Sequence, residues 1–303
     1  MNNFSLLHQA QWIPHNGLNI PDYVFKSIQT AAQIENGKLP VMDKRASMYL
    51  NQDYAVFLHT LIWLRSYRVE LHTFELNPYW AVMLETVSFY AYGDPQYLIQ
   101  NASLIYDQLK RQFIMRRTAL EHLNFIAPIS NGVKQQKAMF KRYIDKYKQM
   151  NCIYFELPYL FNLQPTALSE SVLPKIARKW LEKLNQAEGL KDKLSDVQWR
   201  IVKLLNGIYV VQAIFYIIGE EDEYFQSILS AWMSACICNG YEWMSNAQCA
   251  FIQKYCYFAD QDMRSFWRSF LERHAEIYKI YRYEREHISY VWKSYTGNIT
   301  IKK

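Results

Sequence analysis

Two helices are expected to meet at one short stretch, Phe89-Tyr90-Ala91-Tyr92-Gly93-Asp94-Pro95. Gly93 suits the left-handed backbone conformation that often ends a helix. Asp94 is a good N-cap for the next helix, and Pro95 fits its first turn. Apolar residues at helical spacing lie on both sides, over residues 80–92 and 97–109. The stretch therefore predicts an antiparallel helical hairpin.

A second stretch has the same order of residue types, Phe215-Tyr216-Ile217-Ile218-Gly219-Glu220-Glu221-Asp222. Both copies read Phe-Tyr, two further residues, Gly and an acid. Because apolar patterns over 208–218 and 224–237 flank the second copy, we expect another helical hairpin there, with Gly219 and Asp222 at its turn. An internal duplication and the same cap chemistry at two unrelated helix ends both explain the likeness.

The predicted fold class is all-α: a multi-helix body of antiparallel helical hairpins, with two similar halves as one option. Half of the residues are hydrophobic, so a large core is available. Only nine glycines and nine prolines are present, and no proline follows Pro174, which is unusual for a turn-rich β protein. Outside the two hairpins, helices are expected over 22–34, 51–74, 111–125, 134–150, 174–187, from 197 onward, 247–258 and 260–295. A break is expected between the third and fourth of these, near Pro128 and the Ser130-Asn131-Gly132 turn.

The chain is predicted to have four parts. Residues 1–50 read as an irregular arm with one short helix, and residues 51–150 as an N-terminal helical half. A proline-containing crossover over 151–174 leads to a C-terminal helical half over 175–303.

Cysteine usage and hydropathy indicate a cytoplasmic protein without a cofactor. The five cysteines are an odd number at spacings that match no usual zinc site, so we expect buried packing thiols. The first ten residues lack a basic segment followed by a long apolar run, so no secretory signal is expected. The most apolar segment, residues 201–218, contains Lys203, Asn206 and Gln212, which favours a buried core helix over a membrane span.

Positive charge is concentrated in one segment of the sequence. Between Lys110 and Lys148 there are ten basic and two acidic residues, whereas the rest of the chain has a small acidic excess. Such a concentration attracts an acidic partner, a phosphate backbone or an anionic lipid surface, and it also suits a solvated helix face. The candidate binding residues in this segment are Arg116, Arg117, Lys137, Lys141, Arg142 and Lys148.

No catalytic motif is recognisable in the sequence. It lacks a glycine-rich phosphate loop, a zinc-binding His-Glu-x-x-His helix and a nucleophile elbow. Glu284 and His287 form one Glu-x-x-His pair, which on a helix would be half of a di-iron site, but no second pair is present. Solvated helix residues are the simpler interpretation, so no catalytic residue and no metal ligand is predicted.

At its two Gly-acid stretches the chain resembles the all-helical, two-part immunity proteins of bacterial polymorphic toxin systems. The resemblance lies in residues 89–109 and 209–232. It implies an all-helical fold and a cognate toxin as the protein partner.

Three functions follow as hypotheses. The first is a non-enzymatic binding protein, most specifically an immunity protein that occludes a cognate bacterial toxin, and its motivation includes the 24 tyrosines and nine tryptophans, which are common interface anchors. The second is a nucleic-acid-associated helical protein that uses the basic segment over 110–148. The third is a helical metal-dependent enzyme centred on Glu284 and His287. The oligomeric state and the binding face are left open.

Overall fold

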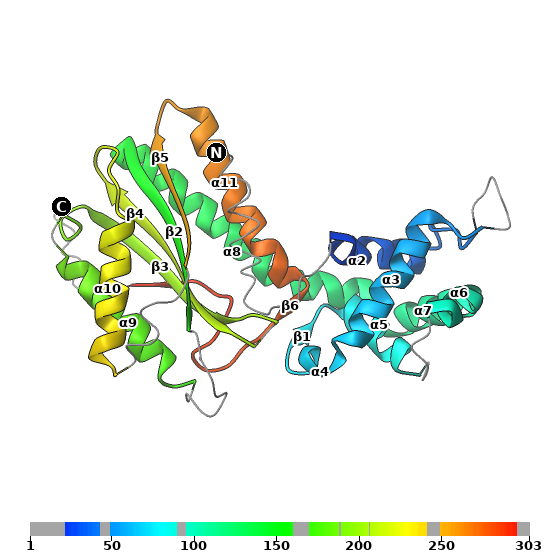
Figure 1. The fold of residues 1–303 in the computed structure, drawn as a ribbon. Coiled ribbons are helices and arrows are strands. Elements are labelled where there is room, and N and C mark those ends of the chain that lie inside the picture. Colours follow the sequence, from blue (N-terminus) through cyan, green and yellow to red (C-terminus); the bar gives the residue numbers. More distant parts are fainter. Residues whose placement is uncertain are drawn as a thin grey trace. The chain divides into compact units, whose positions relative to one another are not determined.

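The computed structural model describes residues 22–42, 49–89, 95–159, 170–187, 189–205, 207–240 and 249–295. They form two compact units (Figure 1). The first unit holds the described residues of 131–276 and 283–295, and the second holds those of 22–130 and 277–282. Helix α8 (Thr118–Tyr147) begins in the second unit and ends in the first.

The first unit contains a five-stranded antiparallel sheet, so the all-α prediction is wrong. Its strand order is β5-β2-β4-β3-β7. The strands are β2 (Gln149–Tyr159), β3 (Leu194–Lys203), β4 (Tyr209–Ile218), β5 (Ala250–Tyr257) and the short β7 (Lys293–Ser294). The second unit has no such sheet among its described residues, so the prediction of two similar halves is wrong as well.

The connections of the sheet follow the β-α-β-β-α-β order of the ferredoxin-like, or split β-α-β, motif. Helix α9 (Leu173–Gln186) joins β2 to β3, and helix α10 (Phe225–Cys238) joins β4 to β5. Strand β4 lies between β2 and β3, with all neighbouring strands antiparallel.

Both faces of the sheet are covered by helices (Figure 1). On one face, Trp180 of α9 and Trp232 of α10 pack against Phe155 and Phe215 in a fully buried core. On the other face, α8 and α11 (Gln261–Glu276) contribute a second core. Its members are Phe140, Ile144, Met150, Cys152, Tyr154, Ile214, Tyr216, Ile252, Cys256, Trp267, Phe270 and Leu271.

Burial on both faces explains why the sequence pattern misled. Strand β4 reads Tyr-Val-Val-Gln-Ala-Ile-Phe-Tyr-Ile-Ile, and residues 210–217 are all buried. A strand that is covered on both sides has no polar face, so its apolar run lacks the alternation that identifies half-buried strands. The β-branched and aromatic residues were the remaining signal for a strand.

Two further predicted helices are replaced by strands, and a third is shorter than predicted. Strand β3 lies where a helix was expected from Val197, and β5 lies where one was expected over 247–258. The predicted helix over 260–295 ends with α11 at Glu276. It is followed by a 3-10 turn (Ile277–Lys279) and the short strand β6 (Tyr281–Arg282).

The second unit is helical with one small two-stranded sheet. Its helices are α2 (Asp22–Glu35), α3 (Gln52–Ser66), α4 (Arg68–Leu71), α5 (Pro78–Phe89), α6 (Pro95–Gln100), α7 (Ala102–Arg116) and the start of α8. Strand β1 (Glu75–Leu76) pairs with β6, which comes from the far end of the sequence. Tyr54, Phe57, Trp80 and Phe113 are among its fully buried side chains.

The turns predicted from glycine have different outcomes. Gly93 and Asp94 lie outside the described residues, and Pro95 is the first residue of α6. Gly219 has a φ of 127° directly after strand β4, so it ends a strand and not a helix. Asp222 accepts a hydrogen bond from the Glu223 N–H in the loop before α10.

Helix α8 is continuous where a break was predicted. It runs through Pro128 and the Ser130-Asn131-Gly132 stretch without interruption. The observed break lies earlier, at Arg117, which adopts the left-handed conformation with a φ of 55°.

Candidate functional site

The basic residues predicted to bind are divided between the two units. Arg116 and Arg117 belong to the second unit, whereas Lys137, Lys141, Arg142 and Lys148 belong to the first. Arg116 forms an ion pair with Glu85, and the Lys137 Nζ atom lies 2.7 Å from a carboxylate oxygen of Glu272.

The other four predicted residues are exposed. Lys141 and Arg142 lie on the solvent side of α8, and Arg117 and Lys148 follow the ends of α7 and α8. Both of these end residues have a positive φ, 55° for Arg117 and 65° for Lys148. These four predicted residues are therefore exposed and form no ion pair within the described chain.

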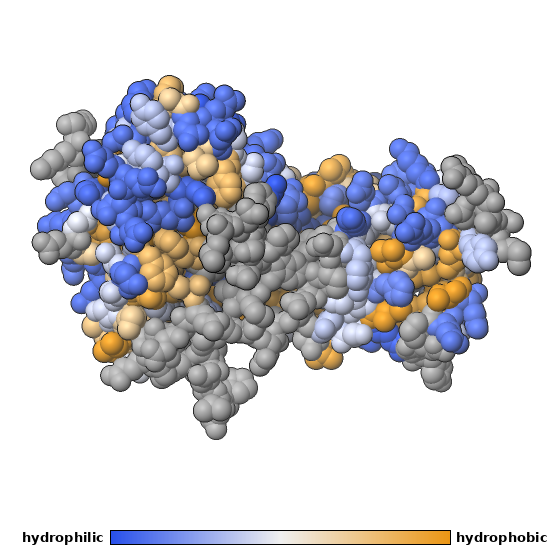
Figure 2. All heavy atoms as spheres, turned by 45° about the horizontal axis from the view of Figure 1, so that its top comes forward, coloured by the Kyte–Doolittle hydropathy of each residue, from blue (hydrophilic) through white to orange (hydrophobic). Residues whose placement is uncertain are grey.

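A set of exposed hydrophobic side chains lies on the two helices that flank Arg117 in the second unit. We call it the α7–α8 patch. It consists of Leu104, Ile114, Met115, Leu120 and Leu123, which are exposed to 57%, 55%, 76%, 54% and 58%. Hydrophobic side chains are visible at the surface of the second unit in Figure 2.

Local structure explains why these side chains face outward. Helix α7 places Ile105, Leu109 and Phe113 in the core, so Ile114 and Met115, which follow Phe113 on the helix, face solvent. Only Arg117 separates the two helices. Its N–H donates to carbonyls at the end of α7, and its own carbonyl accepts from the Leu120 N–H at 2.9 Å.

The patch has cations at its border. Arg111 lies three and four residues before Ile114 and Met115 on α7, so the three share one face. In the part of the chain that the structure describes, neither Arg111 nor Arg117 has a carboxylate within ion-pair distance. The surface therefore combines exposed aliphatic side chains with two arginines that form no ion pair within the described chain.

A second polar arrangement lies inside the first unit, and we call it the buried polar ring. Its members are Tyr154 and Glu156 on β2, Arg200 on β3, Gln212 on β4 and His274 on α11. All five are at most 6% exposed. Sequence reasoning missed this ring because its members are far apart in the chain, and polar residues within apolar strands, such as Glu156, Arg200 and Gln212, were the available signal.

The hydrogen bonds of the ring run from Arg200 to Glu156 along two routes. Arg200 donates from Nε to the Gln212 Oε1 atom at 2.7 Å, and Gln212 donates to Glu156 at 2.7 Å. Arg200 also donates to His274 Nδ1 at 2.9 Å. Because arginine only donates, His274 carries its proton on Nε2 and donates to the Tyr154 hydroxyl at 2.6 Å. Tyr154 in turn donates to Glu156 at 2.5 Å.

Burial shifts the pKa of both titrating members of the ring. Desolvation raises the pKa of Glu156 to about 7, although the bonds from Tyr154 and Gln212 and the charge of Arg200 act against it. Burial, with a contribution from Arg200, lowers the pKa of His274 well below its usual value. The bond between Arg200 and His274 connects α11 to the sheet. Arg200 also donates to the Tyr290 carbonyl at 2.6 Å and so connects that residue to the sheet.

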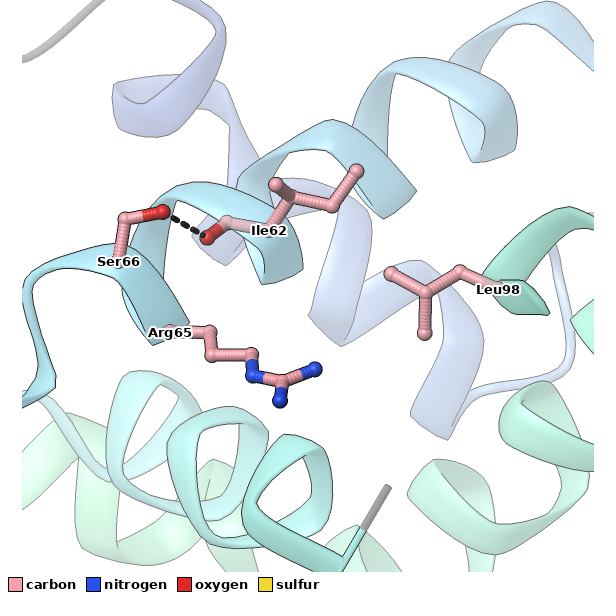
Figure 3. Close-up of a pocket in the computed structure, with 4 residues that line it drawn as sticks. All are labelled: Ile62, Arg65, Ser66 and Leu98. Atoms are coloured by element: carbon pink, nitrogen blue, oxygen red, sulfur yellow. Dashed lines mark hydrogen bonds between the residues drawn. The ribbon is translucent and has the colours of Figure 1, made fainter. Parts of the chain in front are cut away.

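One pocket in the second unit has a volume of about 210 Å³ and is lined by Ile62, Arg65, Ser66 and Leu98. Figure 3 shows the Arg65 side chain extending from α3 toward Leu98 of α6, while the Ser66 hydroxyl donates to the Ile62 carbonyl at 3.0 Å. Ligand sites usually occupy roughly 300–1,000 Å³ and contain several convergent polar groups. This pocket is smaller, and among the described residues that line it Arg65 alone is charged.

The structure does not support the metal site of the third hypothesis. Glu284 and His287 follow β6 in an irregular segment, so the helical spacing assumed for them is wrong. Among the described residues, no group of three or more His, Cys, Asp or Glu side chains is arranged to hold a metal ion. Three of the five cysteines, Cys152, Cys236 and Cys256, are buried thiols as predicted, whereas Cys238 is exposed and Cys249 is partly buried.

Among the described helices, none has both the length and the apolar character that a membrane crossing requires. No protein-family model matches the chain, and comparisons with curated proteins and with solved structures give no match either. The resemblance to toxin-neutralising immunity proteins was based on two helical hairpins. The second hairpin is not formed, because residues 209–218 are strand β4. The toxin-related and all-helical descriptions are therefore not carried further.

Proposed function

We propose that this chain is a non-enzymatic binding protein that recognises another protein through the α7–α8 patch. The observation that carries the proposal is the group of five large aliphatic side chains, each more than half exposed, on two helices joined by one residue. Exposed hydrophobic patches with polar borders commonly mark interaction surfaces.

The exposed side chains would contribute favourable free energy to recognition. Burying the remaining exposed part of one Leu, Ile or Met side chain contributes about 1 kcal/mol, as half of the value for full burial. Five such side chains therefore contribute on the order of 5 kcal/mol before the entropic cost of association. A few residues of this kind dominate most protein interfaces.

The conformation of Arg117 supports a role for its side chain in binding the partner. A residue with a Cβ atom is disfavoured in the left-handed region by roughly 1 kcal/mol, and glycine or asparagine usually occupies this position after a helix. Arg117 is exposed, so packing does not explain the choice of arginine. With Arg111 it favours a partner that presents acidic residues around an apolar centre.

Site-specific photocrosslinking in the native host tests the proposal, because the covalent adduct itself identifies the partner. A photoreactive residue at position 115 should give a discrete protein adduct, and the crosslinked segment, identified by mass spectrometry, should be apolar with flanking acids. The matched control is position 69, because Val69 is 81% exposed in the same unit but lies outside the patch. Equal adduct patterns at 115 and 69 would contradict the proposal.

Two variants then separate binding from folding. Leu120→Asp with Leu123→Asp should abolish the adduct at position 115, whereas Val69→Asp should leave it unchanged. Arg117→Gly should raise the unfolding free energy by about 1 kcal/mol and still weaken capture of the partner, because it relieves the left-handed conformation and removes the charge. An Arg117→Gly variant that binds as tightly as the original chain would exclude a role for this arginine.

A further inference from the structure

A cluster of cations and aromatic rings lies at one end of the sheet in the first unit. Lys148 precedes β2 and Phe258 follows β5, and the Phe258 N–H donates to the Lys148 carbonyl at 2.7 Å. The Lys148 Nζ atom lies 4.3 Å from the centre of the Phe258 ring, and the Arg264 Cζ atom lies 5.3 Å from the same ring. Both cations therefore interact with one exposed aromatic side chain.

A second pair extends this cluster along the edge strand. Lys254 of β5 places its Nζ atom 5.0 Å from the centre of the Phe266 ring on α11. We call Lys148, Lys254, Phe258, Arg264 and Phe266 the Phe258 cluster. It lies on the side of the sheet that α8 and α11 cover, because Ile252 and Cys256, two residues to either side of Lys254, belong to that core.

The three cations of the Phe258 cluster form no ion pair within the described chain. No carboxylate among the described residues lies within ion-pair distance of Lys148, Lys254 or Arg264. Nearby Asp260 accepts a hydrogen bond from the Met263 N–H at the start of α11. Contacts with ring faces leave these cations able to bind an anion.

Two further features indicate a ligand. The Phe258 side chain is 40% exposed. Lys148 has a φ of 65° and closes α8 by donating its N–H to the Ile144 carbonyl, a position that glycine or asparagine fills at lower cost. Core packing therefore explains neither the conformation of Lys148 nor the exposure of the Phe258 ring.

We propose that the Phe258 cluster binds single-stranded nucleic acid. Lys148, Lys254 and Arg264 would contact phosphates, and the exposed ring of Phe258 would contact an unpaired base, which is how sequence-tolerant single-strand sites are built. The site differs from the basic segment noted in the sequence, with which it shares only Lys148.

Acidic residues favour a strand over an anionic membrane as the ligand. Burial and, to a smaller extent, the nearby Glu220 and Glu221 raise the pKa of Tyr255, whose side chain lies on the opposite face of β5 from Lys254. A flat anionic bilayer at this end of the sheet would approach these carboxylates, whereas a narrow strand can follow the α8–α11 side alone. The proposal concerns the first unit and is independent of the α7–α8 patch.

Fluorescence anisotropy with labelled oligothymidylate tests the site. The full-length chain should bind the single strand more tightly than a duplex of equal length or vesicles of phosphatidylglycerol and phosphatidylcholine. Lys148→Glu with Arg264→Glu should weaken binding at least tenfold and reduce the salt dependence of log K by roughly 1.4, about 0.7 for each lost phosphate contact. The matched control is Lys175→Glu with Arg178→Glu on α9, which changes the charge equally on the opposite face of the sheet.

The aromatic contribution is tested separately. Phe258→Ala should weaken single-strand binding about tenfold without changing the salt dependence, and Phe258→Trp should retain it, because stacking depends on the ring and not on charge. Unfolding temperatures establish that each variant is folded. The proposal is overturned if the original chain does not bind at low salt, if the vesicles bind more tightly than the strand, or if the Lys148–Arg264 variant and its control lose equal affinity.

Discussion

Glu156 and His274 are buried in the same polar ring, but they respond to pH in opposite ways. Burial raises the pKa of Glu156 from 4.5 to about 7, so the folded protein retains a proton that the unfolded chain releases. The Glu156 contribution to the unfolding free energy therefore falls as pH rises from about 4.5 to about 7. His274 has a lowered pKa, so its contribution is present above the ordinary value of 6.5 and is lost as pH falls below it.

The variant Glu156→Gln removes the first contribution and keeps the second. We expect its unfolding free energy to rise more steeply with pH than that of the original chain between about pH 4.5 and pH 7. The difference across this interval should be on the order of 3 kcal/mol. Urea unfolding at a series of pH values measures it, with exposed Glu284→Gln as the control, and parallel profiles for the Glu156→Gln variant and the original chain would refute it.

Helix α8 contains residues that usually interrupt helices. Pro128 removes one backbone hydrogen-bond donor. Gly132 has no side chain to restrict its backbone conformations in the unfolded chain, so it loses more entropy on folding. All 30 residues are nevertheless helical. A Cβ atom added at Gly132 meets no atom within 4 Å, so the site has room for alanine. Packing of Phe125, Ile129, Phe140 and Ile144 on the buried side maintains the helix despite this unfavourable local sequence.

Gly132→Ala should therefore stabilise the protein by about 1 kcal/mol, which is the difference in helix propensity between the two residues. Thermal and urea unfolding measure the effect. Gly219→Ala is the contrasting control, because its φ of 127° disfavours any residue with a Cβ atom, and this variant should be destabilised. A destabilised Gly132→Ala variant would show that α8 is not continuous at this position.

At the scale of the whole molecule, the second unit depends on residues from the end of the sequence. Strand β6 pairs with β1, Arg282 forms an ion pair with Glu75, and the buried Asn77 side chain donates to the Lys279 carbonyl at 2.8 Å. The Asn77 N–H also donates to the Ile280 carbonyl at 2.7 Å. Residues about 200 positions apart in sequence thus complete one unit.

A chain that ends at Glu276 should consequently have a destabilised second unit. Asn77 is buried and would lose two hydrogen-bond partners, each loss costing about 1–3 kcal/mol. Hydrogen exchange should become faster in peptides from β1 and the start of α5. A chain that ends at Arg282 retains these contacts and serves as the control, and equal protection of β1 in both chains would disprove this dependence.

Several elements could be predicted from sequence because their signals are local. The helix predicted over 22–34 corresponds to α2, the one over 174–187 to α9, and the one over 224–237 to α10, each with an apolar face at helical spacing. The exposed positions of Lys141 and Arg142 also follow from the periodicity of α8. Cap residues and one-sided burial leave a pattern in the sequence.

The sequence alone determined amphipathic helices and the location of the basic residues, because those properties depend on neighbours within a few positions. Only the tertiary structure decided that the apolar runs of β2 and β4 are strands, since layers of helices bury both faces and remove the alternation. Tertiary structure also brought Lys148, Phe258 and Arg264 together and enclosed Glu156 with Arg200. Those contacts depend on strand order, and local sequence does not encode which strands become neighbours.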